Sequence, residues 1–322
     1  MRFRANLLFR LIGCEMKQFK KMLVGVDLSS GDQIVSDELS APNHEAVRQA
    51  IWLARSNGAT IRFCYILDVS PQAQHNIESD EHSAIKLQAQ AKLEELVALA
   101  QQDGVSADTC IGFGNGAVGV IQEVLRNNID LVVVGTRHLS AVKGMLMGST
   151  SLKLMRKCPC PVWVVQPDPD PCQSILVAHD LRDVGKYALQ LGASMATMQQ
   201  GRLHVLHSIE VAHVDQSLTN RPDEHSIEQY RTKAEATIQS ELADCQFAGD
   251  VQVSVVLDRP ADAILQYVQQ HDIDLLAMGT VGRTGIPGFI IGNTAERLLP
   301  QLPCSVLAVK PSDFKTPVSA TD

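Results

Sequence analysis

The sequence lacks any apolar run approaching the length of about 20 residues that is needed to cross a membrane. It also lacks an excess of positive charge. The formal net charge is -8, and because residues 1–21 contribute +5 from six Lys/Arg and one Glu, the rest of the chain carries -13. Nucleic-acid binding would require a basic face. We therefore expect neither a membrane protein nor a nucleic-acid-binding protein.

Paired cysteines at zinc-site spacing are missing as well. The eight cysteines are scattered, and Cys158-Pro159-Cys160, which could chelate a soft metal, has no second pair to accompany it. Most of the thiols lie within or beside apolar runs, as expected for reduced cysteines that act as small hydrophobic side chains. We predict no structural metal and a cytoplasmic location.

What the chain does contain is an alternation of strand and helix signals that occurs twice. The predicted strands are residues 22–27, 61–67, 109–113, 131–134 and 161–165, and then 175–179, 203–208, 251–257, 275–278 and 305–309. The predicted helices are residues 46–54, 83–101, 117–127 and 149–157, and then 184–199, 226–245, 261–270 and 294–302. Such alternation is typical of βαβ units and a parallel sheet.

A length of 322 residues suits two domains. We predict two tandem Rossmann-like α/β domains, each a five-stranded, mostly parallel sheet flanked by helices. The first domain is placed at residues 22–166 and the second at 174–310, with a short proline-rich linker between them. Residues 1–21 form an extension, for which a short basic membrane contact is the alternative. We expect residues 311–322 to form a disordered tail.

A glycine pattern recurs after the fourth predicted strand of each half. In the second half it comprises Met278, Gly279, Gly282, Gly292, Asn293 and Thr294. In the first half it comprises Val134, Gly135, His138, Gly148, Ser149, Thr150 and Ser151. Such glycines let backbone N–H groups approach a phosphate, and a Gly-Ser/Thr element that opens a helix adds hydroxyls and a positive dipole end. They could be plain turn glycines, but the matched spacing favours two nucleotide-phosphate cradles.

An aspartate closes the first predicted strand of each half. Asp27 and Asp180 are 153 residues apart. Ligands of parallel sheets bind beyond the carboxyl ends of the strands, so each aspartate should meet the glycines of its own half at one rim. There the carboxylate could accept hydrogen bonds from a ribose or an adenine. A solvated acid or a helix cap is the alternative.

The spacing Gly-x2-Gly-x9-Gly-Ser/Thr resembles the ATP-binding signature of the universal stress protein family. Two copies resemble the E-type tandem members of that family, over roughly residues 20–312. The resemblance implies an adenine nucleotide alpha hydrolase-like fold and binding of ATP, or of AMP or ADP, which Mg²⁺ could accompany. It also implies that residues 161–165 and 305–309 join the two domains as an intrachain pseudo-dimer, leaving a homodimer open.

Each half departs from the family pattern at one element. His138 stands where the second glycine is expected, and its side chain would either crowd the phosphates or, if cationic, pair with them. In the second half, Asn293-Thr294 replaces the usual Ser/Thr pair. Ala295 there lacks the hydroxyl that Ser151 offers in the first half.

No catalytic set accompanies the glycine patterns. The chain has no Gly-x4-Gly-Lys-Ser/Thr loop and no Ser-Gly-Gly-x-Asp-like loop of the adenylating ATP pyrophosphatases, so we expect at most slow ATP hydrolysis. The prediction is a regulatory or protective stress protein that is not an enzyme. One alternative is a nucleotide-free interaction protein, favoured by His138 and Ala295; the other is an ATP-dependent adenylating enzyme. The occupied half, the inducing stress and the downstream partner stay open.

Overall fold

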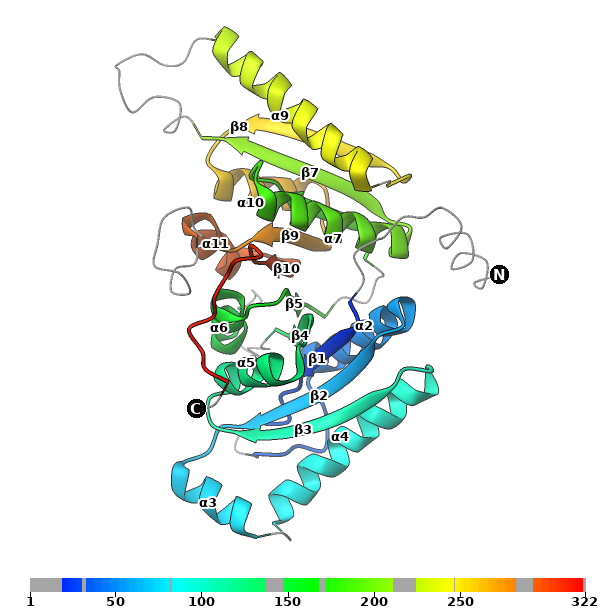
Figure 1. Ribbon diagram of the computed structural model, residues 1–322, viewed down its shortest axis with the longest axis vertical. Coiled ribbons are helices and arrows are strands. Elements are labelled where there is room, and N and C mark those ends of the chain that lie inside the picture. The colour runs from blue at the N-terminus through cyan, green and yellow to red at the C-terminus, as the bar shows by residue number, and fades with distance from the viewer. Residues whose placement is uncertain are drawn as a thin grey trace. The chain divides into compact units, whose positions relative to one another are not determined.

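The computed structural model describes residues 19–30, 33–80, 83–136, 147–167, 172–210, 224–245, 247–281 and 292–320. It divides into two compact units. The larger unit contains the first repeat together with residues 279–322, and the smaller unit consists of residues 171–278. Each unit is an α/β structure, which confirms the predicted fold class (Figure 1).

The larger unit is built on a sheet with the strand order β3-β2-β1-β4-β5-β10. Its first five strands are mutually parallel: β1 (Lys21–Gly25), β2 (Thr60–Leu67), β3 (Ala107–Phe113), β4 (Leu131–Gly135) and β5 (Val162–Val165). The helices of this repeat are α2 (Ala41–Asn57), α3 (Pro71–Ser79), α4 (Ala84–Gln102), α5 (Gly116–Asn127) and α6 (Ser149–Lys157). The chain reverses direction across the sheet after β3, so α2 and α4 cover one face and α5 and α6 the other (Figure 1).

The end of the second repeat completes the larger unit. It contributes α11 (Asn293–Leu298), the 3-10 helix η1 (Leu299–Gln301) and β10 (Ser305–Val309). β10 pairs antiparallel with β5, and Val306 lies opposite Val164 while Ala308 lies opposite Val162. This is the contact between last strands that the sequence resemblance implies.

In its described residues, the smaller unit carries four parallel strands in the order β9-β6-β7-β8. They are β6 (Ser174–Ala178), β7 (Arg202–Ile209), β8 (Val251–Leu257) and β9 (Leu275–Gly279). The helices are α7 (Asp183–Gln199), α9 (Glu224–Cys245) and α10 (Pro260–Gln270).

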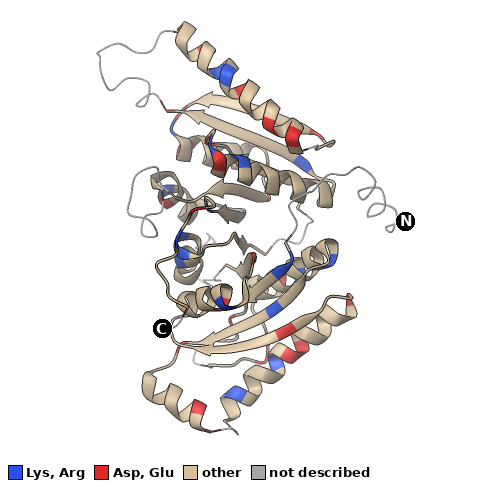
Figure 2. Ribbon diagram, in the orientation of Figure 1, with Lys and Arg blue, Asp and Glu red and all other residues tan. Residues whose placement is uncertain are grey.

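The central strands are buried on both faces, as parallel sheets require. Residues 22–24, 131–134 and 275–278 are all buried. Charged residues instead occur on helices such as α4 and α9 (Figure 2). Among the described residues, no helix combines the length and the apolarity needed to cross a bilayer.

Two local features differ from the sequence-based expectation. Helix α3 was not predicted, because only Ile77 of its nine residues is buried and it therefore shows no apolar stripe. The helix predicted at 294–302 is divided, since α11 ends at Leu298 and a 3-10 turn containing Pro300 follows. Residues 311–320 contain neither helix nor strand, and the carbonyl oxygen of Ala320 accepts a hydrogen bond from Nε of Arg126 at 3.1 Å.

Candidate functional site

In the first repeat, the beginning of α2 brings the ends of two strands together. β1 and β4 are parallel neighbours, so Asp27 and Gly135 leave the sheet at the same end. The backbone N–H of Asp27 donates to Oδ1 of Asn43 at 3.3 Å, and Nδ2 of Asn43 donates to the carbonyl oxygen of Asp27 at 2.9 Å. Pro42, the preceding residue of the same helix turn, lies against Gly135. Residues more than 100 positions apart therefore meet at one rim, as the sequence predicts.

Gly135 is required there by packing. A Cβ at this position would lie 2.5 Å from the carbonyl oxygen of Pro42 and 2.6 Å from its carbonyl carbon. Both atoms belong to the backbone of α2 and cannot rotate away as a side chain could. Packing therefore favours glycine at position 135 with or without a bound phosphate.

The carboxylate of Asp27 is exposed at this rim. Its Oδ1 accepts hydrogen bonds from the backbone N–H of Ser29 at 3.0 Å and from the hydroxyl of Ser29 at 2.6 Å. Tyr65 of β2 stands nearby and donates its hydroxyl to the carbonyl oxygen of Ile34. Burial raises the pKa of Tyr65 to about 12, and the charge of Asp27 adds to that rise, so the phenol remains a neutral hydrogen-bond donor.

The beginning of α6 is open to an anion. Gly148 occupies the N-cap position in an extended conformation, no side chain caps the helix, and no acidic residue lies in its first turn. The first N–H groups of a helix lack partners within the helix. Ser149 and Thr150 are exposed, whereas Ser151 is buried. A Cβ on Gly116 would lie 3.7 Å from Thr150, so α5 and α6 begin side by side.

In the second repeat, Asp180 accepts the same kind of local hydrogen bond as Asp27. Its Oδ1 accepts a hydrogen bond from the backbone N–H two residues later, that of Arg182, at 3.1 Å. β6 and β9 are parallel neighbours, with Ala178 opposite Met278, so Asp180 follows its strand at the end where β9 finishes. Helix α7 packs closely on this turn, since a Cβ on Gly185 would lie 2.5 Å from Oδ1 of Asp180.

The two ends of the second glycine pattern are joined by a hydrogen bond. The N–H of Gly292 donates to the carbonyl oxygen of Thr280 at 2.9 Å. The hydroxyl of the buried Thr280 donates to the carbonyl oxygen of Met155 at 3.0 Å and accepts a hydrogen bond from Lys310.

Burial also shapes the chemistry of Lys310 itself. It lowers the pKa of this amine to about 7, an effect that the nearby Cys158 thiol opposes.

The remaining predicted residues offer backbone groups or polar side chains. Val134 and Met278 are buried within their strands, so only their backbone can face a ligand. Asn293 is exposed, Thr294 is half-buried and Ala295 is buried. His138 and Gly282 lie outside the described residues.

Sequence reasoning missed three groups that shape the site. Asn43 was interpreted only as part of a helix start, although its amide makes both hydrogen bonds to the backbone of Asp27. Tyr65 and Lys310 lie in or directly after apolar runs, where nothing in the pattern marks them. Within the described part of the chain, no group of three His, Cys, Asp or Glu side chains could hold a metal ion.

Comparison with known protein families identifies the family to which this chain belongs. The sequence matches the Universal stress protein family over residues 18–166 and again over residues 171–310. The chain belongs to the universal stress protein family. It carries two family domains in tandem, which accounts for the repeated order of strands and helices.

Curated relatives and a solved structure align with this chain over nearly its whole length. Universal stress protein E of Photorhabdus laumondii is 24% identical, and universal stress protein E of Escherichia coli K12 is 25% identical; each alignment covers 95% of this chain and 99% of the relative. The crystal structure of a universal stress protein from Archaeoglobus fulgidus superposes with a TM-score of 0.67 at 20% identity, covering 91% of this chain and 99% of that one. At this identity the structural likeness establishes the fold alone.

Proposed function

We propose that this universal stress protein binds ATP or a related adenine nucleotide at the rim of each repeat and acts as a regulatory or protective factor in the stress response. The observation that carries the proposal is in the first repeat. There the backbone of Asp27, whose carboxylate is exposed, and the end of β4 at Gly135 both contact the beginning of α2. The same repeat supplies the uncapped beginning of α6.

The chemistry of these groups suits the parts of a nucleotide. A helix beginning with unpaired N–H groups and no nearby acid favours phosphate oxygens. The exposed hydroxyls of Ser149 and Thr150 add hydrogen-bond donors beside it. The carboxylate of Asp27 accepts hydrogen bonds, and ribose hydroxyls and the adenine amino group both donate them.

In the second repeat we assign the same role to an equivalent set of residues. Asp180 would accept hydrogen bonds from the ribose or the adenine, while backbone groups and the Thr294 hydroxyl would approach the phosphates. The set comprises Asp180, Met278, Gly279, Gly282, Gly292, Asn293 and Thr294. We expect this repeat to bind more tightly, because Gly282 keeps the family spacing that His138 interrupts in the first.

We further propose that bound nucleotide acts as a signal and is not turned over. The chain has no phosphate-loop lysine motif, and phosphoryl transfer depends on groups that position and activate the attacking oxygen. ATP should therefore be recovered largely intact after prolonged incubation. Steady hydrolysis at the roughly 1–100 per second of kinases would move the adenylating-enzyme alternative to first place.

Native mass spectrometry and calorimetry test the proposal together. Native mass spectrometry of the purified protein should show the added mass of a nucleotide, and calorimetry should detect ATP binding to the emptied protein. Asp27→Ala should weaken ATP binding by the first repeat about tenfold, and Asp180→Ala should do the same in the second repeat, as the loss of a charged hydrogen bond would. Asp103→Ala replaces an exposed acid at the end of α4 and should leave ATP binding by both repeats unchanged. Absence of ATP binding in the wild type would favour the nucleotide-free interaction protein.

A further inference from the structure

A buried histidine fixes the turn that carries Asp180. The side chain of His179 is fully buried. Its Nδ1 accepts a hydrogen bond from the backbone N–H of Leu181 at 3.0 Å, and its Nε2 lies 2.8 Å from Oε2 of Glu241. A backbone N–H can only donate, so Nδ1 is the acceptor. Neutral His179 therefore carries its proton on Nε2, which donates a hydrogen bond to Glu241.

The hydrogen bond from Leu181 holds an unfavourable backbone conformation. Leu181 has a φ of 58°, in the left-handed region that costs a residue with a side chain roughly 1–2 kcal/mol. In this conformation its partly buried side chain packs against Ile209, Ala234 and Val255. The strained residue is thus held at both ends, by His179 through its N–H and by the apolar cluster through its side chain.

Helix α9 supports the histidine through two of its residues. Glu241 of α9 accepts a hydrogen bond from Nε2 of His179. Tyr230 of α9 stacks on the ring of His207, with centroids 6.0 Å apart, and Nδ1 of His207 donates to the carbonyl oxygen of His179 at 2.8 Å. The residue before Asp180 is therefore anchored through both its side chain and its backbone.

The first repeat holds its aspartate in a different way. The residue before Asp27 is Val26, which offers no polar side chain, and the turn is fixed by the amide of Asn43. In both repeats, Oδ1 of the aspartate accepts a hydrogen bond from the backbone N–H two residues later. The histidine is thus a device of the second repeat.

We propose that His179 is a positioning residue for nucleotide binding by the second repeat. Through Nδ1 it keeps Leu181 left-handed and so orients the carboxylate of Asp180, while Glu241 fixes the tautomer that makes Nδ1 an acceptor. The inference rests on the proposed function. Because Asp180 faces the nucleoside and not the phosphates, a change at His179 weakens AMP and ATP binding by the same factor.

Two substitutions of His179 separate this role from general packing. In His179→Asn, the side-chain oxygen takes the place of Nδ1 and still accepts from Leu181. In His179→Gln, the side-chain amide reaches toward Glu241 but leaves the N–H of Leu181 without its acceptor. We expect the Asn variant to bind within about threefold of the wild type and the Gln variant to lose about tenfold, the value of one buried hydrogen bond.

Photoaffinity labelling with 8-azido-ATP and 8-azido-AMP, followed by peptide mapping, measures the two repeats separately. Labelling of the first repeat is the internal control and should not change in either variant. Equal losses in the Asn and Gln variants, no loss in either, or labelling of the first repeat alone in the wild type would overturn the role of His179. Failure of the wild type to label in either repeat would instead overturn the proposed function.

Gly185→Ala provides a second route if the Gln variant does not fold. A Cβ at position 185 would lie 2.5 Å from Oδ1 of Asp180 and 2.9 Å from its backbone nitrogen, so it would press on both atoms. The change keeps the His179 side chain, whose Cε1 would meet the new Cβ only at an ordinary contact distance of 3.4 Å, and it favours the helix. It should lower labelling of the second repeat by about tenfold for both nucleotides, like the Gln variant; unchanged labelling would show that the orientation of Asp180 is irrelevant.

Discussion

Lys310 donates a hydrogen bond from its buried amino group to the carbonyl oxygen of Met155, which lies 155 positions earlier in the chain. The residue 144 positions before Lys310 is Gln166, whose side-chain amide donates to the carbonyl oxygen of Leu302 at 3.0 Å. Each repeat thus places a polar residue after its last strand, and that residue reaches a carbonyl of the other repeat. One of these two links is ionisable.

The first prediction concerns the pH dependence of stability. The pKa of Lys310 falls from its ordinary value of 10.5 to about 7 on folding, because burial disfavours the charged form. Between these values the unfolded chain binds the additional proton, so stability should rise with pH by up to about 1.4 kcal/mol per unit, and this gain should be absent below pH 7. Lys310→Gln, which installs the residue of the first repeat, should remove this component. Urea unfolding of the wild type and the Lys310→Gln variant at several pH values measures the unfolding free energy of each. The same pH dependence in both proteins would contradict the prediction.

The second prediction separates two glycines of the first repeat. Gly135→Ala forces a Cβ onto the backbone of Pro42 and should destabilise the protein by about 1–3 kcal/mol, as overpacking does. Gly116→Ala meets only Thr150 at an ordinary contact distance of 3.7 Å and lies in the first turn of α5, where alanine is favoured. It should be neutral or slightly stabilising. Equal melting temperatures for the two variants would show that α2 can shift away from a Cβ at position 135.

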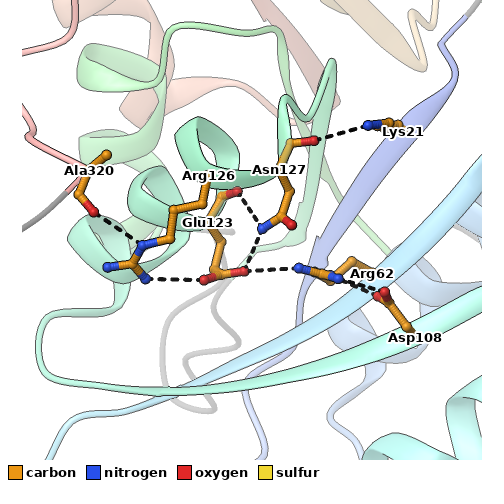
Figure 3. A network of polar contacts seen from close by, with 7 residues as sticks. All are labelled: Lys21, Arg62, Asp108, Glu123, Arg126, Asn127 and Ala320. Carbon is orange, nitrogen blue, oxygen red and sulfur yellow. Dashed lines mark hydrogen bonds and ion pairs between the residues drawn. The ribbon is translucent and has the colours of Figure 1, made fainter.

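The third prediction concerns the polar network between β2 and α5 (Figure 3). Arg62 contacts Asp108 with two nitrogens, at 2.8 and 2.6 Å, and Glu123 with a third, at 3.3 Å. Glu123 also contacts Arg126 and Asn127, and its side chain is 12% exposed against 57% for Asp108.

Solvent screens the exposed Asp108 more than the less exposed Glu123. We therefore expect the contact between Arg62 and Asp108, although shorter, to contribute less to stability than the contact between Arg62 and Glu123. We expect Glu123→Gln to cost about 1–2 kcal/mol and Asp108→Asn less than about 1 kcal/mol. Chemical denaturation of the two variants at low and at moderate salt checks the order. A larger loss for Asp108→Asn would contradict it.

The fourth prediction tests the residue that interrupts the first glycine pattern. If the side chain at position 138 obstructs the phosphates, His138→Gly should increase ATP affinity of the first repeat, most clearly at high pH where the imidazole is neutral. Calorimetry in an Asp180→Ala background isolates that repeat. Weaker binding in the variant would identify His138 as a ligand-binding group.

Sequence periodicity was sufficient for most of the fold because the core strands are continuous apolar runs and the helices carry clear stripes. Strand 251–257 and helix 149–157 have the predicted bounds. The pattern failed where packing supplies no stripe, as in α3 with its single buried residue, Ile77. It also failed where Pro300 converts a helix end into a 3-10 turn.

For the candidate site, the sequence predicted the meeting of strand ends but not what holds them. Parallel topology alone brings Asp27 and Gly135 to one rim. Gly135 approaches Pro42 closely, and Gly185 approaches Asp180. Both contacts depend on how the helices pack on the sheet. The acceptor role of His179 likewise depends on the backbone of Leu181. Such contacts link residues whose spacing carries no signal.

The antiparallel pairing of β10 with β5 has a consequence for any shortened chain. A protein ending at Gln166 would present the unpaired N–H and C=O groups of β5 along its border, together with the apolar Val162, Trp163 and Val164. Exposed sheet borders of this kind recruit further strands. Since β5 already accepts an antiparallel neighbour, a second copy of β5 is the natural replacement. The free first repeat should therefore self-associate at concentrations where the intact protein does not, because the intact chain carries its own covering strand.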